Sequence, residues 1–338
     1  MPVSREQLQV LAAERQLQAA TLERVIRLLD VLAAFAADAE IAPRIALKGG
    51  TALNLFHFDV DRLSVDIDLN YVGALARTEM EADRPRLEKR IDTLMGSMGY
   101  DARRQPAEHA GGKWSYRFAS ILGGAASIEI DINYLYRGPL FGVLRMPSAS
   151  VGTYQAKNVP VLDIHEIVAG KLVALVIRQT ARDLFDAHRI IAMQGLDWAK
   201  VKVATLMIGA SASVFDWRTA SVERIGCDPG DTQQLVMCLH SQYFDRFGGP
   251  VEWIKRAVAD CQAALEPLFA FAANERAFLD RVLNDGIINA SQLEAPEHIR
   301  AAIEACPALQ WKAQNVRAWN AKGTTAGPST KPRKDRRH

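Results

Sequence analysis

Asp66 and Asp68 stand one residue apart in the segment "LSVDIDLNY", which runs from Leu63 to Tyr71. Apolar and polar residues alternate through this segment, and the alternation predicts a half-buried β-strand. Both carboxylates would then project from one face of the strand, where they could bind a hard cation such as Mg²⁺ or Mn²⁺. The alternative is an ordinary strand whose outer face carries two solvated acids.

A second acidic strand is predicted in "SIEIDINYLYR", which begins at Ser127. Its isoleucines fall on one face, whereas Glu129, Asp131 and Asn133 fall on the other. A third carboxylate from this strand would complete a metal clamp for in-line displacement at phosphorus. Asp131 is the first candidate for this third metal ligand or for a proton acceptor, and Glu129 is the second.

A glycine pair precedes the first acidic strand. Gly49 and Gly50 follow the apolar residues 45–47 and lead through Thr51 into a helical run that extends to about His57. The missing side chains would let backbone N–H groups approach a polyphosphate. The segment contains no Walker sequence, which excludes a P-loop. The glycines could also serve only to let a helix pack closely.

The elements around these groups indicate an α+β (α/β) fold, with a mixed sheet and helices followed by a largely helical C-terminal region. Ser4 and Gln7 have the spacing of a capping box, and two helices are expected up to about Ala37. We expect a helix at about 77–98, strands near 114–118 and 127–136, irregular chain at 139–162, and helices from 164 almost to 319. The expected units are N-terminal helices (1–40), a core that contains the glycine pair and both acidic strands (41–140), a mostly helical domain (141–321) and a basic tail (322–338).

The composition is that of a globular protein. The chain has 338 residues, of which 49% are hydrophobic, so it can bury a substantial core. Charged residues interrupt the longest apolar runs, so we expect no membrane span, no signal peptide and a cytoplasmic location. The four cysteines are widely separated and predict buried free thiols rather than a zinc site.

The tail from Lys322 contains six Lys or Arg residues against one Asp, whereas the whole chain has a net charge of +2. The rest of the chain is therefore slightly acidic. Because the tail is rich in Gly, Pro, Ser and Thr, we expect it to be disordered. It could bind an anionic partner electrostatically or act only as a solubilising segment.

The glycine pair, the helix and the two acidic strands together are typical of the nucleotidyltransferase fold. The segments "LKGGTALNL", "RLSVDIDLNY", "IEIDINY" and "EIVAGKLVALVIRQTARDLFD" resemble the AbiEii/AbiGii-type nucleotidyltransferase toxins, which are the toxins of type IV toxin–antitoxin systems. The resemblance covers roughly residues 41–191. The segment "CPALQWKAQNV" near the C-terminus is similar to another element of that family.

This resemblance implies the roles of several residues. Gly49, Gly50 and Thr51 would form the nucleotide-phosphate turn, Asp66 and Asp68 would bind the metal, and Lys171 would contact the triphosphate. Arg62 and Ser64 match the family's "R-x-S-x-D-x-D" run, which makes Ser64 a nucleotide-binding candidate.

The resemblance also implies a function. The chain would transfer NMP from an NTP to an RNA acceptor, with the 3′ end of tRNA as the first candidate, release pyrophosphate and block translation. It would be controlled by a cognate antitoxin and act in abortive infection against phage. The alternatives are transfer to a protein or small-molecule hydroxyl, and a regulatory protein that binds nucleotides without turnover.

The helical segment around Lys171 offers further candidates. On one continuous helix, Lys171, Arg178, Arg182 and Arg189 would fall within about 20° of one line, with Asp186 about 60° away. Arg178 and Arg182 would then bind nucleotide phosphates, and Asp186 would be a site residue that holds a basic side chain in place. If the helix instead breaks near Thr180, Asp183 becomes a capping residue.

Overall fold

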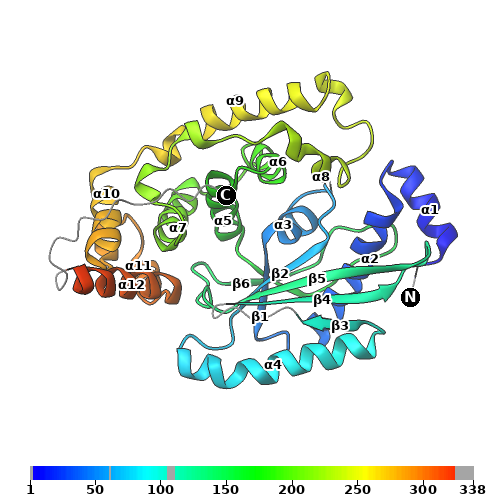
Figure 1. Cartoon of the computed structure of the whole chain (residues 1–338), viewed down its shortest axis with the longest axis horizontal. Helices are drawn as coiled ribbons and strands as arrows, with labels where there is room; N and C mark the ends of the chain where they lie inside the picture. Colours follow the sequence, from blue (N-terminus) through cyan, green and yellow to red (C-terminus); the bar gives the residue numbers. More distant parts are fainter. Residues whose placement is uncertain (1–2, 61, 105–110, 324–338) are drawn as a thin grey trace.

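The computed structural model describes residues 3–60, 62–104 and 111–323. Its centre is a seven-stranded mixed sheet with the strand order β3-β4-β5-β2-β1-β7-β6 (Figure 1). β2 pairs antiparallel with β1 and parallel with β5, so the two predicted acidic strands are direct neighbours. The strands are β1 (Ile45–Lys48), β2 (Asp66–Tyr71), β3 (Asp101–Arg104), β4 (Gly111–Ala119), β5 (Ala125–Asn133), β6 (Val143–Met146) and β7 (Val159–Leu162).

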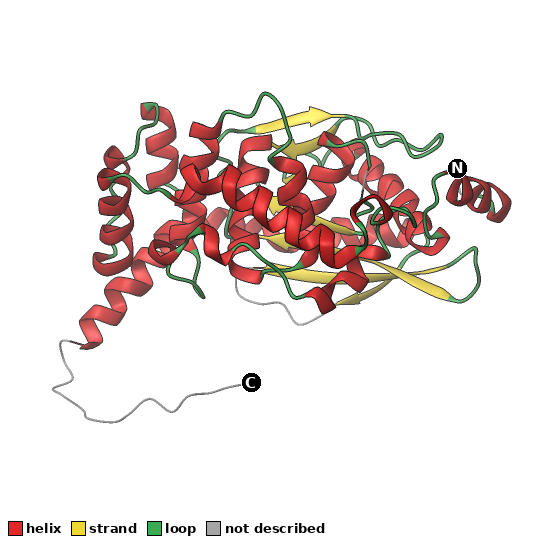
Figure 2. Cartoon of the chain, turned by 90° about the horizontal axis from the view of Figure 1, so that it is seen from above, coloured by secondary structure: helices red, strands yellow, loops and turns green. Residues whose placement is uncertain are grey.

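Helices surround this sheet and form the C-terminal half of the molecule (Figure 2). The predicted capping box is confirmed, because Ser4 accepts from the Gln7 N–H at the start of the first helix and the Gln7 side chain accepts from the Ser4 N–H. The larger helices are α1 (Arg5–Glu14), α2 (Ala19–Ala37), α4 (Arg77–Ser97), α5 (Ile164–Arg178), α6 (Ala181–Ile190), α7 (Trp198–Ser211), α9 (Pro250–Phe269), α10 (Ala273–Asp280), α11 (Glu297–Glu304) and α12 (Pro307–Gly323). The shorter ones are α3 (Gly49–Ala52), which continues as a π-helical turn to His57, and α8 (Thr232–Val236).

The two faces of the central strands have different surroundings. Ile67, Leu69, Ile130 and Ile132 are fully buried within the hydrophobic core, to which α2 also contributes. The intervening polar residues face the opposite side, toward α5. The predicted alternation in both acidic strands is therefore confirmed, and it directs the acids toward the helical half of the molecule.

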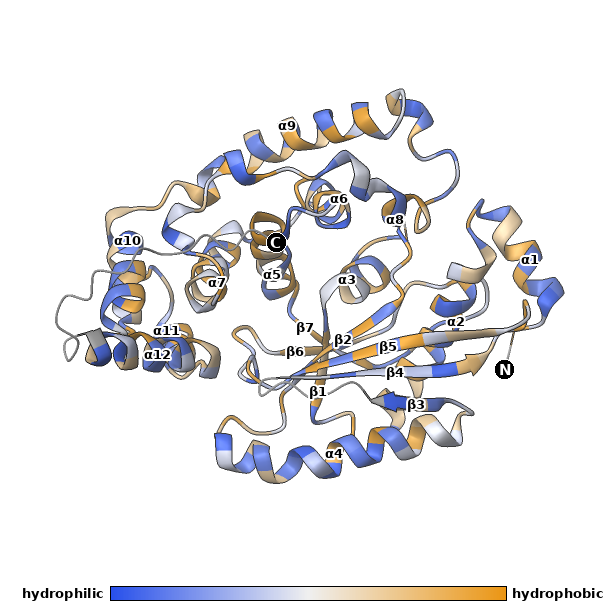
Figure 3. Cartoon of the chain, in the orientation of Figure 1, coloured by the Kyte–Doolittle hydropathy of each residue, from blue (hydrophilic) through white to orange (hydrophobic). Residues whose placement is uncertain are grey.

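α5 is predominantly hydrophobic along its length (Figure 3). It packs against α6 and α7, as well as against α3 beside the sheet. Because a helix that is hydrophobic on most of its faces is buried, α5 forms the centre of the helical half. Two of its four polar residues, Glu166 and Lys171, are buried and line a cavity together with residues of the acidic strands.

The prediction of irregular chain at 139–162 is wrong, because this segment contains β6 and β7. β7 has the sequence "VPVL", is buried at every position and pairs with β1 and β6. A four-residue strand is too short to show an alternation, and Pro160 lowers the strand propensity further. These strands extend the sheet beyond β1.

The continuous helix assumed for Lys171 to Arg189 is also wrong. α5 ends at Arg178, Gln179 adopts a left-handed conformation with φ 54°, and Thr180 caps α6 by accepting from the Asp183 N–H. The predicted alternative, a break near Thr180 with Asp183 as capping residue, is confirmed. The cationic stripe along one helix therefore does not exist as a single line.

Among the described residues, no helix combines the length and hydrophobicity that a membrane span requires. The four cysteines are free; Cys238, Cys261 and Cys306 are buried as predicted, whereas Cys227 is partly exposed. Lys322 and Gly323 belong to the end of α12, and the rest of the predicted tail, 324–338, lies outside the described residues. The division into domains remains a prediction.

Candidate active site

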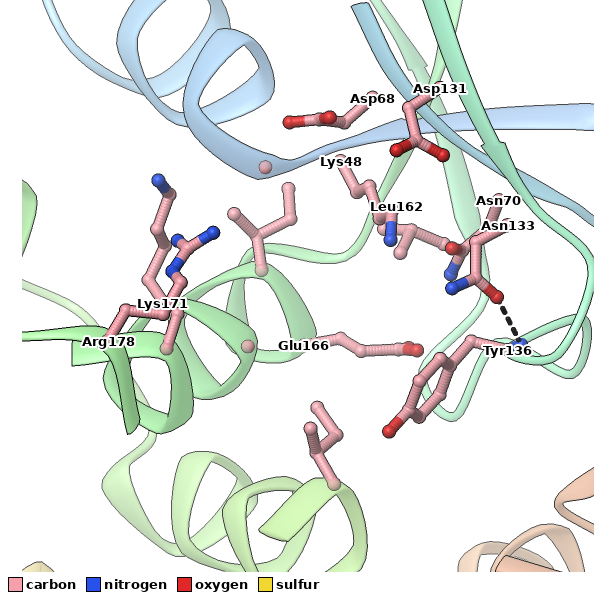
Figure 4. Close-up of a pocket in the computed structure, with 15 residues that line it drawn as sticks. Lys48, Asp68, Asn70, Asp131, Asn133, Tyr136, Leu162, Glu166, Lys171 and Arg178 are labelled. Carbon is pink, nitrogen blue, oxygen red and sulfur yellow. Dashed lines mark hydrogen bonds between the residues drawn. The ribbon is translucent and has the colours of Figure 1, made fainter. Parts of the chain in front are cut away.

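The acidic side chains of β2 and β5 lie in register. Asp68 pairs with Asp131 and Asp66 with Glu129 across the parallel strands, whose neighbours are about 4.8 Å apart. The carboxylates of Asp68 and Asp131 project into the same cavity (Figure 4). The spacing in the sequence therefore brings two carboxylates from different strands to one place.

The environment of Asp66 is crowded with negative charge. Burial raises its pKa, and the neighbouring carboxylates of Asp68 and Glu129 raise it further, against the opposing effect of Arg182 and Lys113. A cation placed among these acids would lower that pKa and relieve the repulsion. This donor set of hard oxygens therefore fits a divalent cation such as Mg²⁺.

No group of three or more His, Cys, Asp or Glu side chains in the described part of the chain forms a complete metal cluster. Mg²⁺ is usually held by one or two carboxylates together with waters and substrate phosphates. Asp68 and Asp131 are the pair that faces the cavity. The three-carboxylate set with Asp66 remains a prediction.

Glu129 and Asp131 differ in where they lie relative to the cavity. Glu129 Oε2 lies 2.7 Å from Lys113 Nζ of β4, and Lys113 also acts electrostatically on Asp131. Asp131 lines the cavity beside Asp68, which Glu129 does not. The position of Asp131 in the cavity supports the prediction that Asp131, ahead of Glu129, is the third carboxylate of the site.

The glycine turn lies directly against the acids. Gly49 has φ +71°, and a Cβ at this position would lie 2.3 Å from Asp68 Oδ2. A Cβ on Gly50 would lie 3.0 Å from Arg62 Nη2 and 3.4 Å from Lys171 Nζ. The turn is therefore packed between the acidic strand and a basic pair, where only small residues fit.

Thr51 joins the turn to the strand that carries the acids. Its hydroxyl oxygen lies 2.9 Å from Ser64 Oγ and 2.5 Å from the carbonyl oxygen of Asp66. Thr51 and Ser64 are both buried. These two predicted nucleotide-binding residues therefore position the turn relative to β2.

Replacing Gly49 with alanine is expected to reduce nucleotide transfer by about a hundredfold. The new methyl group would displace the Asp68 carboxylate, and a shift of about 1 Å in a reacting group can cost that much. Initial rates at saturating NTP measure the effect. Gly124→Ala is the matched control, because Gly124 has a similar φ of +77° and no heavy atom within 4 Å of its added Cβ. If both variants lost activity equally, the cause would be backbone strain at a positive φ and not the displacement of Asp68.

Asp186 is the centre of a buried ion-pair network. Its carboxylate accepts from Arg62 Nε and Nη2 at 3.1 and 3.0 Å, and it lies 2.7 Å from Lys171 Nζ. Asn54 Nδ2 donates both to Asp186 and to the carbonyl of Gly50. Burial alone would raise the pKa of Asp186, but the two cations hold it at about 2. Asp186 therefore holds Lys171 and Arg62 in place, as the sequence indicated for a basic side chain, and it is linked through Asn54 to the glycine turn.

Asp183, a capping residue of α6, also forms ion pairs with the basic residues of the site. It receives a bidentate contact from Arg178, with Nη2 at 2.7 Å from Oδ1, and it lies 3.7 Å from Lys171 Nζ. Arg178 and Lys171 both line the cavity, so Asp183 helps to hold them there. Asp183 and Asp186 of α6 thus both lie within 4 Å of Lys171 Nζ.

The two other arginines of the predicted stripe, Arg182 and Arg189, lie in different parts of the structure. Arg182 lies close enough to Asp66 to lower its pKa, but it does not line the main cavity. Arg189 stacks on the ring of Phe58, 5.5 Å from its centroid, and borders a different hollow. The predicted stripe is therefore divided between the site and the outer surface.

The cavity has a volume of about 350 Å³, and several of its lining residues were missed in the sequence. Asn70 and Asn133 lie two residues beyond Asp68 and Asp131 on the same strand faces, so the period of two could have identified them. Lys48 directly precedes Gly49. Tyr136 and Glu166 carry no signal in the sequence, because only the tertiary fold brings them to the acids.

Burial raises the pKa of Glu166 to about 7. An unfolded glutamate releases its proton near pH 4.5, so the folded state loses stability as the pH rises from about 4.5 to 7. Glu166→Gln removes this loss. We expect its free energy of unfolding, relative to the wild type, to increase by about 2–3 kcal/mol between pH 5 and pH 8. Urea titrations at both pH values measure the difference, and a constant difference would contradict the prediction.

A glycine turn against an acidic strand, a parallel acidic neighbour and a lysine from a buried helix define the chain as a nucleotidyltransferase of mixed α/β fold. The family model "Nucleotidyl transferase AbiEii toxin, Type IV TA system" matches residues 30–286, and the chain belongs to this family.

One solved structure supports this assignment of the fold. The nucleotidyltransferase toxin MenT4 from Mycobacterium tuberculosis H37Rv aligns with a TM-score of 0.55 and 15% identity, covering 91% of this chain and 99% of that one. JHP933 from Helicobacter pylori aligns with a TM-score of 0.39 and 16% identity, covering 91% and 97%. A comparison with curated proteins gives no match.

Proposed function

We propose that this nucleotidyltransferase toxin transfers a nucleotide from an NTP to an RNA acceptor, in a reaction that depends on Mg²⁺. The observation that carries the proposal is the placement of Asp68 and Asp131 in register beside Gly49, in a cavity that Lys171 also lines. Hard oxygen ligands and fixed cations on opposite walls suit a magnesium polyphosphate.

Each group has a proposed role. Asp68 and Asp131, with Asp66 beside them, would hold Mg²⁺ or Mn²⁺, which when bound neutralises phosphate charge and orients the reacting oxygens. Lys171 and Arg178 would attract the polyphosphate, while Gly49, Gly50 and Thr51 form the turn that lets it approach. Ser64 would hold this turn, and Arg182 would moderate the charge of the acids.

The reaction forms one bond and breaks one. The acceptor hydroxyl oxygen attacks the α-phosphorus, and the bond from that phosphorus to the bridging oxygen breaks, so that pyrophosphate leaves with the electron pair. A carboxylate of the site accepts the hydroxyl proton. Asp131, which is more exposed than Asp68, is the candidate for this step as the alternative to its role as a metal ligand.

The acceptor we propose is the 3′ end of tRNA, whose modification would block translation. A toxin of this class implies a cognate antitoxin, which we expect to control the activity during phage defence. The reaction would take place in the cytoplasm, where NTPs and tRNA are available. Protein or small-molecule hydroxyls and binding without turnover are the competing outcomes of the test.

The test is incubation of the protein with Mg²⁺, total tRNA and each α-labelled NTP in turn, with Asp66→Ala alongside. Label on tRNA with the wild type and not with the variant supports the proposal. Label on the protein itself or on a small molecule would redirect it to another acceptor. Nucleotide binding without any labelled product would leave only the regulatory alternative.

A further inference from the structure

The cavity beside Asp68 and Asp131 has two ends of different character (Figure 4). One end carries the acids, Gly49 and the cations Lys171 and Arg178. The other end, which we call the amide end, is lined by the polar residues Asn70, Asn133, Tyr136 and Glu166 and by the apolar residue Leu162 (Figure 4). Lys48 lies between the two ends (Figure 4). A polyphosphate fits the first end, where Lys171 and Arg178 supply positive charge, whereas the amide end carries amides, Tyr136 and Glu166.

The geometry of the sheet sets the distance between the two ends. Asn70 pairs with Asn133 across β2 and β5, one period of two beyond the pair of Asp68 and Asp131. Two residues along a strand span about 7 Å. The amides therefore follow the acids at a spacing that leaves room for one sugar ring.

Asn70 has a hydrogen-bonding group without a partner. Its side chain is only 3% exposed, and its Oδ1 has no hydrogen-bond partner among the described residues. Buried polar atoms in native proteins are nearly always satisfied, so this oxygen, in a residue that lines the cavity, is available to accept a hydrogen bond from a ligand or a water. A primary amide offers one acceptor and two donors, which together match the edge of a heterocyclic base.

The other residues at the amide end fit such a base. Asn133 is held by its Oδ1, which accepts from the N–H groups of Leu135 and Tyr136, and its amide nitrogen lies on the cavity side (Figure 4). The hydroxyl of Tyr136 lies 2.5 Å from Ser211 Oγ, so its ring is held in place as an aromatic wall. Glu166 accepts from the Leu140 N–H at 2.8 Å and closes the end.

From this arrangement we infer that the amide end binds the base and ribose of the NTP, and that Asn70 determines which base is accepted. The inference rests on the proposed function for its choice of ligand. One end of the cavity would bind the triphosphate, which all NTPs share, and the amide end would bind the base, in which they differ. The hydrogen bonds between the Asn70 side chain and the base would form in a buried place. Their loss should therefore change the selectivity among the four NTPs more than it changes the affinity for the phosphates.

The test measures dissociation constants by calorimetry for the four NTPs and for inorganic tripolyphosphate, each with Mg²⁺. In the wild type one NTP is expected to bind at least about tenfold more tightly than another. Asn70→Leu, which is close in shape, is expected to reduce this ratio to less than about threefold, with tripolyphosphate affinity unchanged. Asn70→Ser provides the same comparison if the leucine variant does not fold.

Arg178→Gln is the contrasting variant, because Arg178 lies at the phosphate end. It is expected to raise the dissociation constants of all four NTPs and of tripolyphosphate by a common factor, so that the ratio between the NTPs is preserved. The inference would be overturned by a wild type that binds all four NTPs equally or binds none. It would also be overturned if Asn70→Leu reduced the affinity for tripolyphosphate as much as the affinity for the NTPs. Because binding is measured without RNA, a failure to label RNA would refute the proposed acceptor and leave this result unaffected.

Discussion

Replacing Asp68 with asparagine is expected to reduce nucleotide transfer by about a thousandfold or more. The substitution keeps the shape of the side chain but removes the charge that would bind the divalent cation, whose contribution to catalysis is several kcal/mol. It also removes one of the like charges that raise the pKa of Asp66, so the fold should not lose stability. Single-turnover rates with labelled NTP measure the loss, and urea denaturation confirms that the variant is folded.

Two further variants show whether the effect belongs to the cavity. Asp131→Asn should lose activity to a similar degree, because its carboxylate shares the cavity with Asp68. Glu129→Gln should lose little, because this carboxylate is paired with Lys113 on the neighbouring strand. Full activity in Asp131→Asn together with inactivity in Glu129→Gln would reverse the assignment of the third acid.

Asp186→Ala is expected to destabilise the protein by about 3–5 kcal/mol. The substitution leaves Arg62 and Lys171 buried without the carboxylate that holds them, and an unpaired buried charge costs about this much. It should also release Lys171 and the glycine turn, so activity should fall at temperatures where the variant is still folded. Urea denaturation followed by circular dichroism gives the change in the free energy of unfolding.

Glu81→Ala is the control for this substitution, because Glu81 forms an exposed ion pair with Arg77. Breaking an exposed pair is expected to change the free energy of unfolding by less than about 1 kcal/mol. If the two variants were destabilised equally, the network around Asp186 would be no more important than a surface ion pair. If Asp186→Ala kept full activity, its proposed positioning role would be wrong.

The parts of the site that local sequence patterns control were predictable. The alternation around Asp66 and Asp131 identified both acidic strands and the face on which the acids lie. Thr180, three residues before Asp183, carried the signal of a new helix, and the structure follows it. Helical spacing also favoured Asp186 as a partner of Lys171, although the continuous helix on which that spacing was measured does not exist.

The parts that depend on long-range packing were not predictable. Glu166 lies on a helix whose start is a capping signal, yet only the packing of α5 against the sheet brings it beside Asn70. β7 is buried on every residue, and a short buried segment shows no period from which a strand could be recognised. The separation of Arg189 from Arg182 follows from the path of α6 relative to the sheet.

The ion pairs around Lys171 have an unequal charge count. Arg62, Lys171 and Arg178 contribute three formal positive charges, and Asp183 and Asp186 contribute two negative ones, so the group carries a surplus of one positive charge. Most of these side chains are buried, where dissolved ions screen them weakly. The bound polyphosphate would thus act as the missing counterion of the folded protein, which means that nucleotide should raise the resistance of the toxin to unfolding as well as serve as its substrate.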